Sequence, residues 1–537
     1  MADFTRAGTA FMREGFLMVL LVCRLLASAQ NVNLSQGLSF DGEPYLAVDP
    51  LNQQHLVVAW MGYIPYQQLA IKTIVTFNAG RSWSQVQSIP HASAGFTSAD
   101  PSLAFDAAGN IFLAYVDYRK NPDSGAVYVM KSSDGGLSWG QRKKVIAAWD
   151  DGIKQPIDRP WLSIDRSGGA FSGRMYVTTK PAPWVLPPNR PYFIRSKDSG
   201  QSWEGWRYID TLNWMAGPYI AGPMAAPETG SNGMFYAIYP SYDPSQSLLP
   251  RFIIARSADG GSSFNYHQVI SGAAGVTDTL AKKGYRLVAD PTDESHLAFI
   301  RISAMFGDPD VVMTESGDGG ISWHDTTRVN DDPAGNGRMQ ELAWAGFSSK
   351  GDLVSAWRDR RHAPDTGYAT SYEIYGAVRW HDSLHFSPNF RISDTLVAFN
   401  QVLKGKGNDF MNVVMADDTM SAVWGDTRDG KLNIWFDRTD LHHPHPGGIG
   451  PVASETPPWL SYGPNPAADR IWAEAPGLAC LVLYDLKGNP VRTVSVANPG
   501  PDTVNSSTIE ISGLPPGEYL LEALTARGNL VQKIIKN

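Results

Sequence analysis

Short apolar runs separated by turn-forming residues recur along most of the chain, whereas long runs with a helical period are rare. Seven runs rich in branched and aromatic residues stand out: 56–60, 111–116, 175–179, 234–239, 297–302, 353–357 and 421–424. Runs of this length and composition between turn-forming residues are typical of β-strands. The 51 glycines and the 11% of aromatic residues in 537 also favour β structure.

An octapeptide with the pattern S/T-x-D-x-G-x-S-W/F follows such a run at five places. Its polar positions are Asn78, Asp134, Asp198, Asp259 and Asp318, and its closing aromatic residues are Trp83, Trp139, Trp203, Phe264 and Trp323. The aspartate binds backbone amides of its own turn, glycine permits a positive φ, and the aromatic ring packs on a core. The copies therefore predict structural turns that repeat about every sixty residues.

The octapeptide resembles the Asp box, or bacterial neuraminidase repeat, of sialidase-type β-propellers. The resemblance covers roughly residues 40–440 and implies an all-β ring of four-stranded blades. It does not by itself imply sialidase chemistry, because one fold carries many functions.

A second repeat, a short first strand closed by an aspartate or glycine turn, occurs seven times. Its copies are 43–49, 100–106, 158–165, 217–221, 285–290, 340–347 and 409–417. The seventh unit lacks the octapeptide, and we expect residues 31–40 to supply its outer strand, because ring closure removes an exposed edge. We therefore predict a seven-bladed propeller; six blades, the number found in sialidases, is the alternative.

The start of the chain predicts export. Residues 1–29 read as a secretory signal, with Arg13, an apolar core at 16–22 and the small residues 27–29. Cys23 leaves with this signal, so Cys480 has no intramolecular partner. A propeller of residues 30–440 is followed by a proline-, glycine- and histidine-rich linker, 441–458.

Residues 459–537 predict a small Ig-like β-sandwich, because short strands alternate with turn signals. The order NP, YDLxG, SGLPPGEY and a basic last strand resembles the sorting domain of type IX secretion. That resemblance implies the type IX machinery as a partner and a secreted or cell-surface location. The apolar part of the signal is too short to span a bilayer, so we expect no transmembrane segment in the mature chain. The net charge of −8 argues against nucleic acid as a partner.

Charged residues occupy the positions that a propeller brings to one rim. First strands begin there and second strands end there, whereas the octapeptide turns lie on the opposite face. The candidate ligand-binding residues are Asp117, Arg119, Arg159, Arg286, Asp359, Arg361, Asp409, Asp426 and Arg428. Two interpretations stay open: Asp–Arg pairs that tie neighbouring blades, which repetition favours, or a ring of arginines that grips an anionic ligand.

The sialidase resemblance adds candidate catalytic residues. That family uses three arginines on the substrate carboxylate, a Tyr–Glu pair as nucleophile and an aspartate as acid/base. By this resemblance Tyr372-Glu373 or Tyr375 supplies the nucleophile pair and Asp100 or Asp158 the acid, and no spacing selects among them. The family's Phe-Arg-Ile-Pro motif before the first Asp box is absent, because residues 30–75 contain no arginine.

The sequence thus predicts an exported propeller that binds an extracellular glycan or a related polymer at its loop-rich rim. A sialidase-like, exo-acting glycoside hydrolase and a surface adhesion or scaffold protein are the alternatives. No cofactor is predicted, and the alternative is a Ca²⁺ ion held by Asp100, Asp158 and Asp409, because hard cations bind several carboxylate oxygens. The linker histidines lack further ligands at metal-binding spacing.

Overall fold

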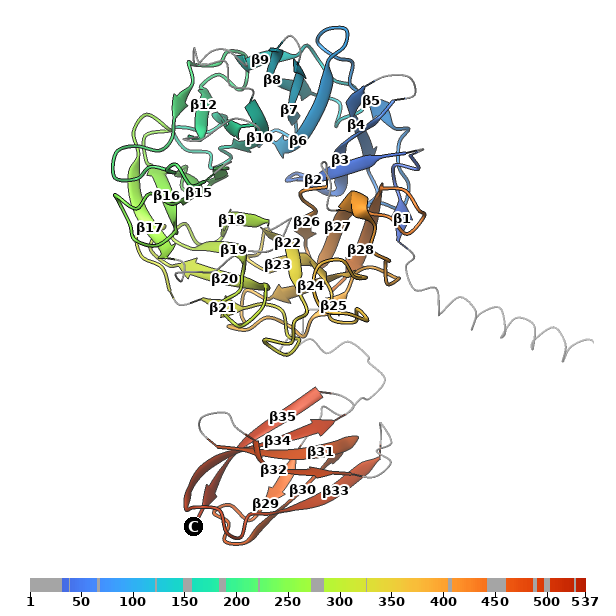
Figure 1. The fold of residues 1–537 in the computed structure, drawn as a ribbon, viewed down its shortest axis with the longest axis vertical. Helices are drawn as coiled ribbons and strands as arrows, with labels where there is room; N and C mark the ends of the chain where they lie inside the picture. The colour runs from blue at the N-terminus through green and yellow to red at the C-terminus, as the bar shows by residue number, and fades with distance from the viewer. Residues whose placement is uncertain are drawn as a thin grey trace, which may run out of the picture. The chain divides into compact units, whose positions relative to one another are not determined.

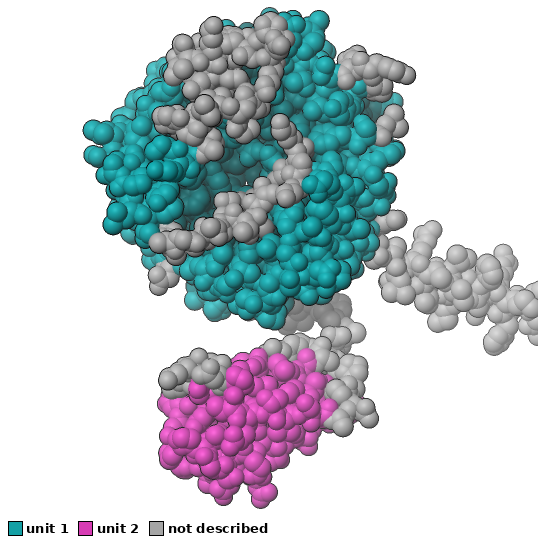
Figure 2. Space-filling view, in the orientation of Figure 1, with its two compact units in different colours: residues 1–443 teal, residues 444–537 magenta. Residues whose placement is uncertain are grey.

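The computed structural model describes residues 31–37, 39–64, 68–120, 123–147, 157–182, 190–220, 223–271, 284–324, 326–403, 408–441, 460–485, 490–496, 503–525 and 528–537. The chain divides into two compact units, Met1–His443 (unit 1) and Pro444–Asn537 (unit 2; Figure 2). The predicted signal lies outside the described residues, and so does the predicted linker apart from Leu441.

Seven four-stranded sheets form the described part of unit 1 and lie around a common centre (Figure 1). In chain order they are β2 (Asp41–Asp49), β3 (Asn52–Tyr63), β4 (Leu69–Thr76) and β5 (Gln87–Ser88); β6 (Thr97–Phe105), β7 (Ile111–Lys120), β8 (Asp123–Ser132) and β9 (Lys143–Ala147); β10 (Ile157–Ile164), β11 (Met175–Pro181), β12 (Tyr192–Ser196) and β13 (Arg207–Tyr208); β14 (Ala226–Thr229), β15 (Phe235–Ser241), β16 (Arg251–Ser257) and β17 (Asn265–Ser271); β18 (Tyr285–Ala289), β19 (Leu297–Ser303), β20 (Asp310–Ser316) and β21 (Thr327–Arg328); β22 (Gln340–Phe347), β23 (Leu353–Asp359), β24 (Glu373–Arg379) and β25 (Phe390–Arg391); and β26 (Asn412–Ala416), β27 (Thr419–Asp426) and β28 (Asn433–Asp440) with β1 (Val32–Asn33). One 3-10 turn, η1 (Gln401–Leu403), is the helical structure among the described residues. The prediction of an all-β protein is confirmed.

The seventh sheet takes its outer strand from the other end of the unit. Val32 pairs with Phe436 and Asn33 with Trp435, so β1 runs antiparallel to β28. The Asn31 side-chain amide adds hydrogen bonds to the Ile392 carbonyl (3.0 Å) and the Asp437 carboxylate (2.9 Å). The two ends of unit 1 are therefore joined by backbone pairing.

Four first strands carry a β-bulge near their beginning. The register shifts between Gly42 and Tyr45, Ala99 and Ser102, Asp158 and Trp161, and Glu341 and Trp344. A residue inside each bulge has a left-handed backbone: Glu43 (φ 55°), Asp100 (54°), Arg159 (52°) and Leu342 (55°). This conformation costs a residue with a side chain about 1–2 kcal/mol, so the fold holds four strained residues at equivalent positions.

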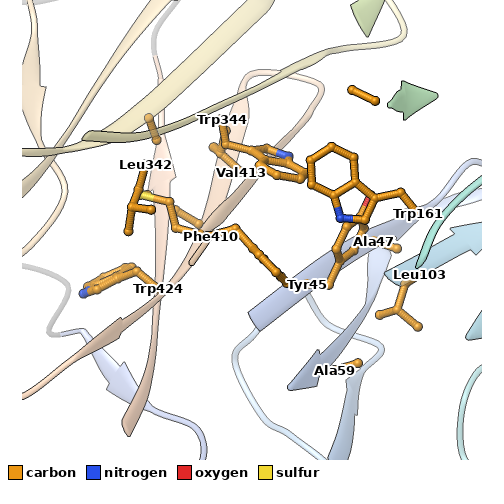
Figure 3. Close-up of a cluster of buried hydrophobic side chains, with 14 of the residues drawn as sticks. Tyr45, Ala47, Ala59, Leu103, Trp161, Leu342, Trp344, Phe410, Val413 and Trp424 are labelled. Atoms are coloured by element: carbon orange, nitrogen blue, oxygen red, sulfur yellow. The ribbon is translucent and has the colours of Figure 1, made fainter. Parts of the chain in front are cut away.

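Just beyond the bulges, aromatic side chains fill the centre of the ring (Figure 3). Trp344 packs edge-on against Tyr45 and Trp161, with ring centroids 5.7 and 5.6 Å apart, and its ring lies 6.3 Å from Phe410. This central aromatic cluster is buried. Tyr45, Trp161 and Trp344 directly follow the bulges of β2, β10 and β22, so these bulges lie on one side of the cluster and the ends of the strands on the other.

All five octapeptides form the turn between the third and fourth strands of a sheet. In the second copy the Asp134 carboxylate accepts hydrogen bonds from the Ser138 amide (2.9 Å) and the Ser132 hydroxyl (2.7 Å). The second glycine packs on the preceding sheet: a Cβ on Gly261 would lie 2.7 Å from the Phe193 ring. The conserved spacing within the motif therefore serves the contact between neighbouring sheets.

Unit 2 contains a three-stranded and a four-stranded sheet. The first is β29 (Ser461–Gly463), β30 (Arg470–Pro476) and β33 (Val504–Glu510), and the second is β32 (Pro490–Ser495), β31 (Leu478–Tyr484), β34 (Gly517–Thr525) and β35 (Gly528–Lys536). Alternate residues of both sheets, such as Ile471, Ile509, Leu481 and Leu521, form one buried core. Cys480 is a free thiol.

Candidate functional site

Five charged residues from four sheets meet where the first strands begin. Glu43, Asp100, Asp158 and Arg159 come from β2, β6 and β10, and Asp409 precedes β26. We call them the mouth cluster. Glu43, Asp100 and Arg159 are each followed by proline and share the left-handed backbone of the bulge. Strained residues of this kind occur at functional sites more often than elsewhere, because the surrounding fold must hold them in place.

Asp100 and Asp158 form a hydrogen-bonded carboxyl pair. Burial and the nearby charges of Asp158 and Glu43 raise the pKa of Asp100 well above its usual range. Burial also opposes the charge on Asp158, but the hydrogen bond from Asp100 and the charges of Lys180 and Arg159 lower its pKa. Lys180 Nζ lies 2.5 Å from Asp158 Oδ2. Of the two acids, Asp100 is therefore the one that retains a proton as pH rises, and it is the donor of the hydrogen bond between them.

Arg159 links the third sheet to the seventh. Its backbone amide donates to Asp100 Oδ2 (3.2 Å), and its guanidinium binds the Asp409 carboxylate and lies over the Phe410 ring, 5.7 Å from its centroid. The Asp158, Arg159 and Asp409 side chains remain 21, 20 and 28% exposed. The cluster is thus reachable from solvent, and the face of unit 1 seen in Figure 2 is hollowed at its centre.

Two atoms of the mouth cluster have unused hydrogen-bonding capacity. Glu43 Oε2 and Arg159 Nε are buried and have no hydrogen-bond partner among the described residues. Leaving a buried polar atom unpaired costs about 1–3 kcal/mol. One is an acceptor and the other a donor, so a hydroxyl group satisfies both. Burial, followed by the charges of Asp158, Asp100 and Glu43, raises the pKa of the neighbouring Tyr118 to about 12.

The sixth sheet contributes a buried ion cluster. Glu341 Oε1 accepts hydrogen bonds from Arg358 and Arg360, both at 2.8 Å, and all three side chains are at most 2% exposed. Arg358 stacks on the Tyr372 ring with its guanidinium carbon 4.7 Å from the centroid. Glu341 Oε2 has no partner among the described residues. This cluster was not among the residues predicted to act on a ligand.

The Asp–Arg signature forms local pairs in two sheets. Asp359 accepts from the Trp357 indole (2.7 Å) and from Arg361 (2.9 Å). Asp426 accepts in the same way from the Trp424 indole (2.8 Å) and from Arg428 (2.6 Å). Each arginine then reaches the connection that precedes its own sheet, where Arg361 binds Asp331 and Arg428 binds Asp394. This geometry is that of the structural interpretation.

The remaining rim candidates do not join the mouth cluster. Asp117 is buried and accepts from the His91 ring (2.9 Å), the Ala92 amide (2.6 Å) and the Ser98 hydroxyl (3.0 Å). Arg119 is exposed. Arg286 pairs with Glu228 at 2.9 Å, beyond the central aromatic cluster.

Tyr372 and Glu373 do not form the expected pair. Glu373 is the first residue of β24 and Tyr372 directly precedes it, and consecutive side chains of an extended chain point to opposite faces. Glu373 binds His362 (2.7 Å) and Arg391 (2.9 Å). Burial raises the pKa of Tyr372, although the nearby Arg358 and Thr427 act to lower it. Tyr368 is a tyrosine nearer to a carboxylate: burial, and then the charge of Glu341, raise its pKa to about 12.

Two of the carboxylates proposed as Ca²⁺ ligands already pair with cationic side chains: Asp409 with Arg159, and Asp158 with Lys180. Within the described ranges no group of three or more His, Cys, Asp or Glu residues is arranged to hold a metal.

The sequence contained a signal for Glu43 but not for Lys180. Glu43-Pro44 occupies the repeat position of Asp100-Pro101 and Arg159-Pro160, so aligning the repeats identifies Glu43 as a member of the cluster. Lys180 joins the site through its pairing with Asp158 across β10 and β11, and that register is visible only in the folded sheet.

Residues 462–537 match the family model of the secretion system C-terminal sorting domain. The protein is therefore exported, to the cell surface or beyond it, and the type IX machinery is its partner. No helix among the described residues is long and apolar enough to cross a membrane.

Solved structures similar to this chain include a protein of unknown function from Dyadobacter fermentans (13% identity, TM-score 0.43), covering 77% of this chain and 98% of that one. Others are the Hadza microbial sialidase Hz136 (15%, 0.40, covering 70% and 74%) and a Penicillium chrysogenum α-L-arabinanase complexed with arabinobiose (11%, 0.42, covering 77% and 98%). No curated protein matches the chain.

Proposed function

We propose that this exported protein binds an extracellular glycan at the mouth of a seven-bladed, Asp-box β-propeller, with an Ig-like β-sandwich as its sorting domain. The mouth cluster carries the proposal. It places charged residues with a strained backbone, from three adjacent sheets, at the centre of the ring, and Glu43 Oε2 and Arg159 Nε are buried and unpaired among the described residues.

The chemistry of the cluster suits a sugar. A sugar hydroxyl both donates and accepts, so it can donate to Glu43 and accept from Arg159 at once. Phe410 and Tyr118 supply aromatic surface beside these polar atoms, in the mixture of apolar walls and few polar groups that small-ligand sites use.

Glycoside hydrolysis is the second candidate, and the proton on Asp100 favours it. A carboxylic acid kept neutral near pH 7 is a competent general acid. Hydrolysis by two carboxyl groups needs them about 5–9.5 Å apart, farther than a hydrogen-bonded pair. In that case Asp158 holds the proton on Asp100, and Glu43 is the second carboxylate.

A glycan array with purified protein tests binding. We expect the protein to be retained on a subset of glycans. The retained amount is expected to fall at least tenfold in the Glu43→Gln and Arg159→Gln variants and to stay unchanged in Glu204→Gln. Glu204 is a carboxylate of the third sheet that pairs with Arg195 and Lys197. Equal retention of all three variants contradicts the proposal.

Incubation of the retained glycans with the protein tests hydrolysis. Release of reducing ends that Asp100→Asn abolishes, while retention persists, makes the protein a hydrolase. Retention without release leaves it a binding protein.

A further inference from the structure

The centre of the ring contains a cavity that the mouth cluster does not line. Its volume is about 230 Å³, and the first strands of all seven sheets contribute to its wall. The wall includes the last residues of these strands, such as Phe105 and Ile164, so the cavity lies on the far side of the central aromatic cluster from the mouth.

The charged groups of this cavity do not cancel. Arg286 pairs with Glu228, with 2.9 Å between Nη2 and Oε2, and both side chains are more than four-fifths buried. Arg166 also lines the cavity, and it makes no hydrogen bond or ion pair with any described residue. Two guanidinium groups therefore face one carboxylate, and the described wall carries one excess positive charge.

Two hydrogen-bond donors of the wall have no partner. Arg286 Nε and Asn412 Nδ2 are buried and unpaired among the described residues, and Asn412 is 1% exposed. These two nitrogen atoms can only donate, so an acceptor satisfies them. Trp344 adds an aromatic wall, with the Arg286 guanidinium carbon 5.4 Å from its ring centroid.

We propose that this cavity binds a small molecule bearing a carboxylate, held by Arg286, Asn412 and Arg166 against the Trp344 wall. Arg286 Nε and Asn412 Nδ2 can each donate to a carboxylate oxygen, and their burial strengthens these bonds. Arg166 adds a positive charge at the exposed edge of the wall. The site is separate from the glycan site at the mouth and does not rest on it.

Calorimetric titration of the full chain with D-glucuronate and with D-glucose tests this. The two sugars share a ring, and one carries the carboxylate. We expect saturable binding of glucuronate at low salt, weakened by added salt. Glucose is expected to bind at least tenfold more weakly.

Variants identify the site. We expect Arg286→Gln and Arg166→Gln to weaken glucuronate at least tenfold, and Arg166 is exposed, so its replacement does not threaten folding. Arg81→Gln makes the same charge change at an exposed residue outside the cavity and is expected to bind like the unaltered protein. Glu43→Gln, at the mouth, is also expected to retain binding.

Three results overturn the proposal. The first is that glucose and glucuronate bind equally well or that neither binds. The second is that the Arg166→Gln variant binds glucuronate as tightly as the Arg81→Gln variant, and the third is that Glu43→Gln abolishes glucuronate binding. The last result assigns glucuronate to the mouth, so failure of the cavity proposal is distinguishable from failure of the proposed glycan site.

Discussion

Asp100 is a carboxylic acid that its surroundings keep neutral. Its desolvation and its two acidic neighbours act in the same direction, and Arg159 only partly opposes them. The folded protein therefore holds this proton more tightly than the unfolded chain, in which the group returns to an aspartate pKa of 3.8. A proton bound more tightly in the folded state makes stability fall as pH rises above the unfolded pKa.

Asp100→Asn removes this pH dependence while keeping a hydrogen-bond donor toward Asp158. We expect the Tm of the variant to rise relative to that of the unaltered protein between pH 5 and pH 9. Below pH 4 the two proteins are expected to converge, because Asp100 is then protonated in both states. Thermal unfolding scans at matched ionic strength measure the difference. A constant offset across this range contradicts a proton retained on Asp100.

Asp426 accepts hydrogen bonds from a buried indole and a stacked guanidinium, so its removal leaves both donors without a partner. We expect Asp426→Ala to lower the free energy of unfolding by about 3–5 kcal/mol, the range for breaking a buried ion pair from one side. Arg119→Ala, at the exposed arginine of the same sequence signature, is expected to change it by less than about 0.5 kcal/mol. Urea denaturation compares the two. Equal losses contradict the local role of the Asp426 pair.

The repeated Asp-x-Arg pattern predicted a shared location but not a shared role. The sequence does not reveal that Trp357 and Trp424 donate to the aspartates, whereas Tyr115 has no indole and Asp117 binds His91 instead. Tyr372 and Glu373 failed as a pair for a simpler reason, since adjacent positions of a strand separate side chains to two faces. Glu43 and Asp100 were predictable as neighbours because their repeats align, and Lys180 was not.

The octapeptide turns work as spacers between sheets as well as turns. The glycine at the fifth position combines a positive φ with a lack of room for a side chain: a Cβ on Gly136 would lie 3.0 Å from Val75 and 3.2 Å from Val57, and one on Gly320 would lie 2.9 Å from Ile254. A motif first interpreted as turn chemistry therefore also sets how closely two sheets pack.

Gly261→Ala tests that second role. The residue has φ +79°, and its new Cβ would lie 2.7 Å from Phe193. The left-handed backbone costs about 1–2 kcal/mol and the overpacking about 1–3 kcal/mol more. Gly430→Ala is a matched control, because Gly430 has φ +76° and nothing within 4 Å of the new Cβ. We expect Gly261→Ala to lower the unfolding temperature clearly more than Gly430→Ala. Equal shifts mean that backbone strain alone explains the glycine.

Periodicity predicted seven units, because each of seven first-strand copies is followed along the chain by a second-strand copy. The fourth first strand was misplaced: it was predicted at 217–221, whereas β14 spans Ala226–Thr229. The cavity beyond the aromatic cluster did not follow from periodicity. Its wall takes a few residues from every first strand, and which of them face the centre depends on the bulges that shift their register. Arg286 illustrates this, since its place in the repeat pointed to the mouth, whereas the folded strand brings it to Glu228 and the cavity.

Closure through β1 makes the stability of unit 1 depend on its first residues. Beyond the Val32 and Asn33 pairing, the Leu34 amide donates to the Ile434 carbonyl (2.8 Å), and Ser35 and Gly37 donate to Asn433 (3.0 and 2.8 Å). Each hydrogen bond contributes about 1 kcal/mol net, so deletion of residues 31–37 is expected to destabilise the unit by several kcal/mol. It also leaves β28 as an unpaired edge, which favours association between molecules.

Light scattering and thermal unfolding of the deletion variant measure both effects, and a synthetic peptide of residues 31–37 provides the control. Added in excess, the peptide is expected to pair with β28, raise the unfolding temperature and suppress association. A peptide with Asn31 replaced by alanine lacks the bonds to Ile392 and Asp437 and is expected to rescue less. If the deletion variant is as stable and monomeric as the full chain, the seventh sheet is instead stable with three strands.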